Sequence, residues 1–357
     1  MAEKDLIAVA DLFDVGEKIS NVCPYGNGHI NYTYEATGEK GKYILQRLNS
    51  SLFTRPDMLM RNIRLVTDYV KNAVKASGDN MKVLEIIKTK DGADYLTDES
   101  GVYRMYKFID DSVCYQQVGS ESDFYYCAYA FGKFATYLDG FDAKELFEVI
   151  PNFHNTVDRM RKFEASLLKD VCGRADGVRK EIEFFLARRS YCPKITSLLE
   201  SGRMPTRVTH NDTKLNNILF DAKTGAPLAI VDLDTVMPGS VCYDFGDSIR
   251  FGCNTAAEDE PDVSLVGFST GLFEAYVKGY VKGFDKITPI ERENLLWGAI
   301  LMTYECGMRF LTDYLDGDTY FHTSRAGQNL DRAHTQMRMV ELMEEKFDEL
   351  QNFVMNA

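Results

Sequence analysis

The 357-residue chain contains no apolar run that approaches the ~18 residues of a membrane-spanning helix. Its first residues, MAEKDLIAVADLF, carry acids where a secretory signal would carry basic residues, so we expect a cytoplasmic protein without a membrane partner. The chain also lacks a GxxxxGK[ST] loop, and no GxGxxG opens a helix. These absences argue against a Walker-type ATPase and a Rossmann dehydrogenase.

Close cysteine pairs and an excess of basic charge are missing too. The eight cysteines show no CxxC spacing, which predicts reduced, mostly packed thiols and neither a disulfide framework nor a zinc site. With 41 Lys and Arg against 54 Asp and Glu, the formal net charge is −13. This balance argues against a nucleic-acid or anionic-membrane partner, whereas a neutral small molecule requires no basic patch.

The most informative stretch of the chain is His210–Asn217, HNDTKLNN, which an apolar run, AIVDLD, follows. These segments supply an acid at Asp212, an amide at Asn217 and a second acid at Asp232, twenty residues after the first. This spacing is similar to that of the catalytic loop and metal-binding strand of kinase-fold phosphotransferases. Phosphoryl transfer depends on positioning and charge neutralisation, and Mg²⁺ prefers oxygen ligands beside substrate phosphates. We therefore predict Asp212 as the catalytic base, and Asn217 and Asp232 as ligands of a magnesium ion that also binds ATP.

A literal DFG at Asp244 competes with Asp232 for the metal role. It lies 32 residues after Asp212 and follows Pro238 and Gly239, which break the chain. We interpret Asp244 as the N-cap of a helix that runs through Ile249 to Phe251.

Asp232, by contrast, follows the apolar strand Leu228–Val231, which is expected to form a hairpin with Ile218–Phe220 through a turn at residues 223–225. The two-residue strand period places Asp234 on the same side as Asp232, which makes it a candidate auxiliary ligand.

The pattern along the chain predicts an α+β, protein-kinase-like fold with two lobes. Residues 1–109 would form a nucleotide-binding lobe with a small antiparallel sheet, and residues 110–357 a mostly helical catalytic and substrate-binding lobe. In the first lobe, polar and apolar residues alternate after Gly28, and Tyr43–Leu48 offers a partner strand. Helices are expected at residues 6–13 and 56–74 and strands at 83–87 and 102–109. In the second lobe, helical periods cover residues 124–138, 157–168, 178–199, 265–280, 295–314 and 330–350.

Several residues of the first lobe are candidates for binding ATP. The turn of Gly26, Asn27 and Gly28 could cradle phosphates, because glycine lets backbone amides approach an anion closely, although an ordinary hairpin turn has the same composition. Adenine would bind backbone groups of Phe108 and Ile109, where the chain leaves the sheet.

The lysine and glutamate that clamp ATP in protein kinases have no clear counterparts here. Gln46 or Arg47 stands at the place of the lysine, and residues 56–74 contain no glutamate. We take Gln46 as a cofactor-binding candidate. The departure favours a small-molecule kinase over a protein kinase.

Several motifs resemble the aminoglycoside phosphotransferase and choline kinase superfamily, most closely its N-acetylhexosamine 1-kinase branch. The resemblance is carried by HNDTKLNN, VDLDTVMPG, YDFGDSIRFG, YGNGHINYTY, YILQRLN and RFLTDYLDGDTYF, which are spread over nearly the whole chain. It implies ATP-dependent phosphorylation of the anomeric hydroxyl of N-acetylglucosamine or N-acetylgalactosamine.

Candidate acceptor-binding residues lie mainly in RFLTDYLDGDTYF. Arg309 would donate to sugar or acetamido oxygens, and Tyr320 would stack on the ring or bind its rim. Phe251 would flank the same pocket, and His29 would lean over the sugar or the phosphate. The alternative is that Arg309 pairs with Asp313, one helical turn away, that Tyr320 only packs, and that His29 is satisfied by a strand neighbour.

Two other interpretations stay open at this point. A kinase of the same fold could act on another small alcohol, such as an aminoglycoside, choline, homoserine or methylthioribose. A catalytically silent pseudokinase is disfavoured by the complete set of Asp212, Asn217 and Asp232. We expect a monomer or a weak homo-oligomer.

Overall fold

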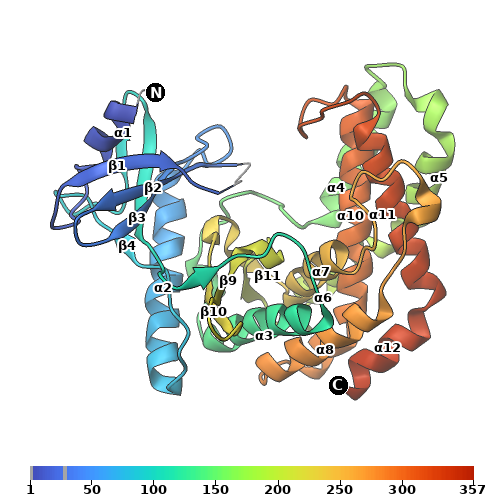
Figure 1. Ribbon diagram of the computed structural model, residues 1–357. Coiled ribbons are helices and arrows are strands. Elements are labelled where there is room, and N and C mark those ends of the chain that lie inside the picture. Colours follow the sequence, from blue (N-terminus) through green and yellow to red (C-terminus); the bar gives the residue numbers. More distant parts are fainter. Residues whose placement is uncertain (1–2, 27–29) are drawn as a thin grey trace. The chain divides into compact units, whose positions relative to one another are not determined.

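The computed structural model describes residues 3–26 and 30–357, which form two compact units (Figure 1). The first unit comprises Met1–Val113, Lys144–Pro151 and Leu219–Val236. The second comprises Cys114–Ala143, Asn152–Ile218 and Met237–Ala357. Neither unit is therefore one continuous stretch of chain. The chain first leaves the first unit after Val113, close to the lobe boundary expected at residue 109.

The main sheet of the first unit is antiparallel and has the strand order β1-β2-β3-β6-β4, with β5 paired to β6. The predicted antiparallel sheet is confirmed. The three-residue β5 was not predicted because so short a strand shows no alternation. The strands are β1 Ile19–Pro24, β2 Tyr32–Gly38, β3 Lys42–Arg47, β4 Ile86–Ile87, β5 Leu96–Asp98 and β6 Gly101–Lys107.

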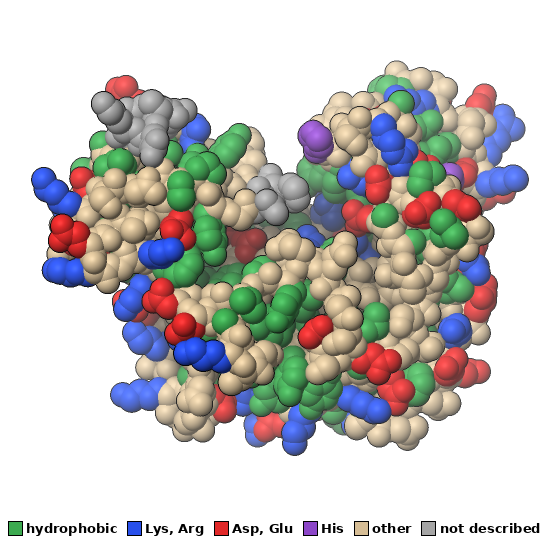
Figure 2. Space-filling model, in the orientation of Figure 1, with side chains coloured by type: hydrophobic (Ala, Val, Ile, Leu, Met, Phe, Trp, Pro, Cys, Tyr) green, Lys and Arg blue, Asp and Glu red, His purple; other side chains and the backbone are tan. Residues whose placement is uncertain are grey.

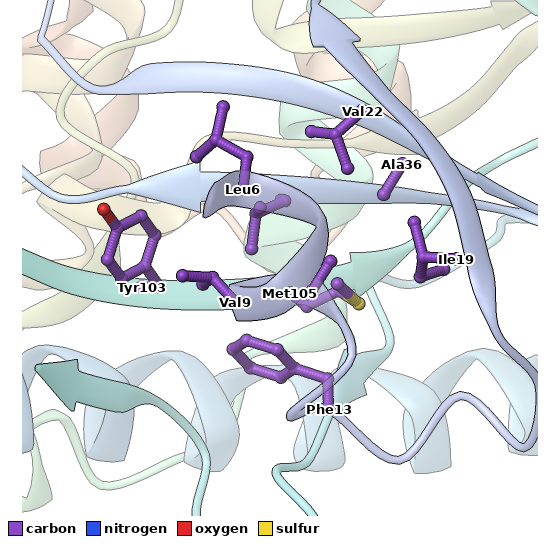
Figure 3. Close-up of a cluster of buried hydrophobic side chains, with 10 residues drawn as sticks. Leu6, Val9, Phe13, Ile19, Val22, Ala36, Tyr103 and Met105 are labelled. Carbon is purple, nitrogen blue, oxygen red and sulfur yellow. The ribbon is translucent and has the colours of Figure 1, made fainter. Parts of the chain in front are cut away.

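One face of this sheet is covered by α1 (Glu3–Ala10) and the residues after it. Leu6, Val9 and Phe13 pack against the sheet, where strand β6 contributes Tyr103 and Met105 (Figure 3). Because side chains alternate along a strand, Arg104 of β6 faces the opposite side of the sheet. Both faces of β6 are buried, so Arg104 is a charged residue inside the unit.

Helix α2 (Pro56–Ser77) also belongs to the first unit. Pro56 stands in its first turn, and Gly78 ends it in the left-handed conformation. The helix predicted to end near Val74 is therefore confirmed and is slightly longer. Its Asn62 donates to the carbonyl oxygens of Phe147 (2.7 Å) and Val236 (3.2 Å), which attaches both later segments of the first unit to α2.

A small second sheet in the first unit contains the predicted hairpin. Strands β9 (Ile218–Asp221) and β10 (Pro227–Ile230) are joined by a turn in which Gly225 has φ 69°, and β9 also pairs with β7 (Ser112–Val113). The hairpin leads directly to Asp232.

The second unit is mostly helical, as predicted. Helix α3 packs along α8, and α10 packs against α7, α4 and α11 (Figure 1). The principal helices are α3 Glu121–Tyr137, α4 Thr156–Lys169, α5 Arg179–Ala187, α6 Pro193–Glu200, α7 Val241–Gly252, α8 Thr270–Gly283, α9 Pro289–Glu293, α10 Leu295–Leu315, α11 Gln328–Glu345 and α12 Phe347–Asn356.

Helices α7 and α10 approach each other closely through glycine. A Cβ atom on Gly246 would overlap the carbonyl oxygen of Gly298, and one on Gly298 would overlap the carbonyl oxygen of Cys242. The glycine of the literal DFG is thus required for helix packing.

Two of the predicted helices are interrupted. In the span 178–199, α5 ends at Ala187 and a 3₁₀ turn covers Arg189–Tyr191. Pro193, which cannot donate a helical hydrogen bond, then begins a new helix, α6. The span 330–350 divides at Lys346 into α11 and α12. The predicted start at Leu265 is also wrong, because a separate 3₁₀ turn, Val263–Leu265, precedes α8.

Among the described residues, no helix has the length and apolar character required to cross a bilayer. Acidic and basic side chains are interspersed over the face shown in Figure 2.

Candidate active site

The expected catalytic loop lies in the second unit, after strand β8 (Arg207–Thr209), which pairs with β11 (Met237–Gly239). The structure brings Asp212 and Asn217 together. The side-chain nitrogen of Asn217 donates to the backbone oxygen of Asp212 (2.8 Å) and to its Oδ2 (3.1 Å). The Asp212 side chain is 24% exposed, so its carboxylate is fixed in position and still accessible.

Lys214 is a second partner of the expected base. Its Nζ lies 2.8 Å from Oδ1 of Asp212. The charge of Asp212 is the main cause that raises the pKa of Lys214, so the lysine stays protonated at neutral pH. Asp212 therefore has a fixed cation on one oxygen and an amide on the other.

Asp244 holds the backbone of this loop. Its two carboxylate oxygens accept hydrogen bonds from the backbone N–H groups of His210 (2.8 Å) and Asn211 (2.7 Å). The predicted helix at Ile249–Phe251 is confirmed as α7, but the prediction that Asp244 caps it is wrong. Ser240 is the N-cap, accepting from the N–H of Cys242, because α7 begins earlier than expected.

Burial raises the pKa of Asp244 to about 6, against the lowering effects of His210 and the two N–H donors. The literal DFG aspartate is thus a buried acceptor that fixes the loop carrying Asp212.

Two further residues of α7 also bind the backbone of the loop that carries Asp212. Asp247 accepts the N–H of Thr213 (3.2 Å), and Ser248 donates to the Thr213 carbonyl oxygen. Burial would raise the pKa of Asp247, but the charges of Arg250 and Lys214 outweigh it and lower the pKa. Asp247 therefore remains an anion that can accept hydrogen bonds.

Asp232 belongs to the first unit and follows the β9–β10 hairpin. It has φ 59°, its side chain is exposed, and it begins the 3₁₀ turn Leu233–Thr235. The convergence of Asp232 with Asp212 and Asn217 of the second unit stays a prediction.

The donor chemistry of the two predicted ligands suits magnesium. The side-chain nitrogen of Asn217 is used by Asp212, which leaves the Asn217 oxygen as the atom for a cation. An amide oxygen and an exposed carboxylate at Asp232 are both hard ligands. No group of three His, Cys, Asp or Glu side chains suited to a metal occurs in the described part of the chain. A site made of one amide and one carboxylate would require the nucleotide's oxygens as further ligands.

Asp234 differs from the expectation of an auxiliary ligand. The chain after Val231 forms a 3₁₀ turn, so the assumed strand period does not apply and Asp234 is buried while Asp232 is exposed. Its carboxylate pairs with the guanidinium of Arg104 and accepts from the side chain of Asn31 (2.6 Å).

The expected nucleotide residues of the first unit are only partly described. Gly26 has φ 72°, a conformation that favours glycine, whereas Asn27, Gly28 and His29 lie outside the described residues. The side chain of Gln46 donates to Thr33 (3.0 Å) and accepts from Arg104 (2.9 Å).

Phe108 and Ile109 follow β6, as expected for an adenine-binding segment. The Phe108 N–H donates to Lys42, and the Ile109 carbonyl accepts from Ser112 (2.7 Å). Tyr25, the residue before Gly26, was not predicted from the sequence as a site residue. Its ring contacts the Phe108 ring edge to face, with 5.8 Å between the ring centroids.

The acceptor candidates lie in the second unit, and two of them meet. The guanidinium of Arg309 lies over the rings of Tyr320 (5.9 Å) and Phe321 (5.4 Å), and Tyr320 is 65% exposed. Asp313 accepts the backbone N–H groups of residues 319–321, so it shapes the loop that carries Tyr320. Phe251 is half-buried near the end of α7.

A buried polar cluster beside these residues was not found from the sequence. His154 contacts both the Asn211 carbonyl oxygen (3.4 Å) and Glu305 (3.3 Å). Glu305 lies one turn before Arg309 on α10, and its carboxylate is 4.0 Å from Nε of Arg159. That Nε is buried without a hydrogen-bond partner, and burial followed by the charge of Arg309 lowers the pKa of Arg159. The Glu305–Arg309 spacing was the only signal that could have indicated this cluster.

A hollow of about 560 Å³ in the first unit lies between α2 and residues 81–88, with Arg64, Lys71 and Lys88 in its lining. It includes none of the expected site residues.

Comparison with known proteins supports the same class of activity. A model of the phosphotransferase enzyme family matches residues 21–283, more than half of the chain. Solved structures also match nearly end to end. The aminoglycoside phosphotransferase of Alicyclobacillus acidocaldarius has 14% identity and a TM-score of 0.63, covering 98% of this chain and 96% of the other.

A spectinomycin phosphotransferase, solved with ADP and spectinomycin, has 13% identity and a TM-score of 0.56, with coverages of 96% and 99%. A Plasmodium vivax ethanolamine kinase has 14% identity and a TM-score of 0.57, with coverages of 96% and 86%. At these identities the structures confirm the kinase-like α+β fold, and the family match identifies the class. The chain belongs to the phosphotransferase enzyme family.

Proposed function

We propose that this protein is an ATP-dependent kinase that phosphorylates the anomeric C1 hydroxyl of N-acetylglucosamine or N-acetylgalactosamine. The observation that carries the kinase chemistry is the geometry of Asp212. Its carboxylate is accessible, lies between Lys214 and Asn217, and stands on a loop whose backbone is held by Asp244. Such rigid placement is the main requirement for transferring a phosphoryl group.

In the proposed mechanism, Asp212 orients the C1 hydroxyl and accepts its proton. The hydroxyl oxygen attacks the γ-phosphorus as the bond to the bridging oxygen breaks, and ADP leaves. Asn217 and Asp232 would hold Mg²⁺, which supplies charge neutralisation on the phosphates when bound. Gly26, Asn27 and Gly28 would approach the phosphates through their backbone. Because Asp212 acts as a base, no phosphoenzyme is required.

Adenine would be read by backbone groups after β6. The N–H of Phe108 and the carbonyl of Ile109 already have partners, so the Phe108 carbonyl and the Ile109 N–H are the groups we assign to adenine. Tyr25 would contact the base from the side of the glycine turn. Gln46 has two side-chain partners, so we assign it an indirect role beneath the phosphates.

The charge around Arg309 supports the proposed acceptor class. Arg159 and Arg309 place two guanidinium groups beside Tyr320, and the charge of Arg309 is one of the causes that lower the pKa of Arg159, after burial. Cationic acceptors such as choline or aminoglycosides require an anionic pocket, which this pair opposes. Hydroxyl and acetamido oxygens of a neutral sugar can accept from both arginines, and Tyr320 can cover the sugar ring. His29 and Phe251 would complete the contacts.

An acceptor panel with ADP release as the measurement tests this proposal. N-acetylglucosamine and N-acetylgalactosamine should each release ADP in the presence of Mg²⁺, whereas glucosamine and choline should not. Phosphorylation at C1 removes the reducing end, so a reducing-sugar assay on the product locates the phosphate. Turnover of choline or an aminoglycoside in preference to both sugars would contradict the proposed acceptor. Absence of ADP release with every acceptor would instead support a pseudokinase.

We further propose that the enzyme acts in the cytoplasm as a monomer or a weak homo-oligomer. Sedimentation at several protein concentrations measures the oligomeric state.

A further inference from the structure

A buried polar network in the first unit links several segments that are far apart in the sequence. Arg104 of β6 and Asp234 form an ion pair in which the side chains are only 1% and 5% exposed. The Nε of Arg104 also donates to the Gln46 side chain of β3 (2.9 Å), and its guanidinium lies over the Tyr106 ring. The fully buried guanidinium of Arg104 therefore connects Asp234 to strands β3 and β6 of the main sheet.

The other carboxylate oxygen of Asp234 accepts a hydrogen bond from Asn31, the residue just before β2. Asn31 donates its side-chain nitrogen to Oδ2 of Asp234 (2.6 Å), and its side-chain oxygen accepts the N–H of Asn49 (3.0 Å). Asn31 lies five residues after Gly26. Asn31, the residue before β2, is thus attached to the same carboxylate as Arg104.

The buried guanidinium of Arg104 is kept charged by the carboxylate of Asp234. Burial alone would lower the pKa of Arg104, but the charge of Asp234 outweighs it and raises the pKa. Removing one member of a buried pair leaves an uncompensated charge, whereas replacing both by apolar groups of similar size is often tolerated. Buried pairs of this kind are retained where they fix one geometry.

The geometry fixed here is that of the turn carrying Asp232. Asp234 is two residues after Asp232, within the 3₁₀ turn Leu233–Thr235. Asp232 itself has φ 59° and an exposed side chain, and β10 ends at Ile230. The anchored carboxylate of Asp234 therefore determines how the turn directs Asp232.

We propose that Arg104 is a positioning residue for the magnesium–nucleotide site: through Asp234 it fixes the turn that presents Asp232. In protein kinases the strand lysine that pairs with a helix glutamate contacts the ATP phosphates. Arg104 would instead act indirectly, through Asp234. The inference rests on the proposed function only in taking Asp232 as a metal ligand.

The decisive variant replaces both members of the pair, Arg104→Met with Asp234→Leu. It removes the ion pair without leaving a buried charge, so we expect the thermal unfolding midpoint to stay near that of the wild type. The Kd for Mg·ATP, measured by calorimetry without acceptor, should rise at least about tenfold. The KM for the acceptor should stay within about twofold, because Arg104 has no acceptor contact in this scheme.

Measuring ATP binding in EDTA separates positioning of the metal ligand from direct phosphate contact. A positioning residue predicts that the variant and the wild type bind ATP equally without Mg²⁺. A loss of affinity of the same size in EDTA would overturn the proposal, because it would indicate that Arg104 binds the phosphates. A folded double variant with wild-type Mg·ATP affinity would overturn it as well.

The matched control is Arg64→Gln, which breaks an ion pair with Asp94 on the surface of the same unit, where Arg64 is 47% exposed. Its Mg·ATP affinity should equal that of the wild type. Asn31→Ala should give a smaller loss than the double variant, because Arg104 still holds Asp234. All of these binding measurements are independent of the acceptor, so a failed acceptor panel would leave this inference intact.

Discussion

At the scale of the residue, each important acid of this protein has a partner that determines its role. Asp212 is accessible and lies between a cation and an amide. Asp244 is buried and accepts backbone N–H groups, and Asp234 is buried and pairs with Arg104. In the sequence all three are aspartates, and their spacing alone does not distinguish their roles. The accessible one is the proposed base, and the two buried ones hold loops in place.

Replacing Asp212 by asparagine tests the proposed base. The amide keeps the size of the side chain but cannot accept the proton, so we expect kcat to fall about 10²–10⁴-fold. Calorimetry should show that Mg·ATP still binds with nearly normal affinity. Near-normal turnover by the variant would refute the role of Asp212.

The replacement Asp232→Ala should instead weaken the binding of Mg·ATP. It removes the proposed carboxylate ligand from an exposed position, so the fold should be retained while the Kd for Mg·ATP rises at least about tenfold. If titration calorimetry finds the wild-type affinity, Asp232 is not a metal ligand.

Replacing Arg309 by methionine tests the acceptor pocket. Methionine keeps the contact with the Tyr320 and Phe321 rings but loses the charged donor, and a charged hydrogen bond contributes about 1.5–3 kcal/mol. We expect the acceptor KM to rise roughly 10- to 150-fold while the KM for ATP is unchanged. Steady-state kinetics with both substrates varied distinguishes this result from a general loss of activity.

The pH dependence of stability should reveal Asp244. Its pKa in the folded state, about 6, is above the ordinary value of 3.8, so the folded state binds the proton more tightly than the unfolded state. The stabilisation from this proton is present below pH 3.8 and is lost as the pH rises through about 6. Urea unfolding between pH 4 and 7 should therefore show that wild type loses stability relative to Asp244→Asn as the pH rises. A constant difference between the two proteins would contradict the assignment.

At the scale of the element, helix α7 combines two tasks. Its first turns carry Asp244, Asp247 and Ser248, which hold the catalytic loop, while Gly246 faces α10. The position of the proposed catalytic loop therefore depends on the packing of α7 against α10.

Gly298→Ala should show how much this helix contact contributes. The new methyl group would overlap the Cys242 carbonyl oxygen, and overpacking of this kind costs about 1–3 kcal/mol. Gly177→Ala is the control, because a Cβ there meets no atom within 4 Å. Urea unfolding should place Gly177→Ala near the wild type, and an equal result for both variants would exclude the close packing.

The sequence allowed prediction of those elements whose signal is local. The HNDTKLNN spacing placed Asp212 beside Asn217, and the hairpin that leads to Asp232 was found from its turn and its apolar strand. The roles of Asp234 and Asp244 were not predictable in this way. Each depends on a partner 33 or more residues away, Arg104 in one case and the His210–Asn211 backbone in the other. Strand or helix periodicity carries no information about such pairings.

At the scale of the whole molecule, the chain passes repeatedly between its two units, after Val113, Ala143, Pro151, Ile218 and Val236. Neither unit could be recovered intact by cutting the chain once. The proposed nucleotide residues, apart from Asn217, belong to the first unit, and the base and the acceptor residues other than His29 belong to the second.

This threading has a consequence for biosynthesis. Arg104 leaves the ribosome 130 residues before Asp234, its partner. Until then the nascent sheet holds a cation that cannot yet be neutralised, so we expect the first unit to complete its folding only after the first two segments of the second unit, Cys114–Ala143 and Asn152–Ile218, have been translated. A stalled chain that ends before residue 234 should remain sensitive to protease in its first hundred residues, and one extended past the turn should become resistant.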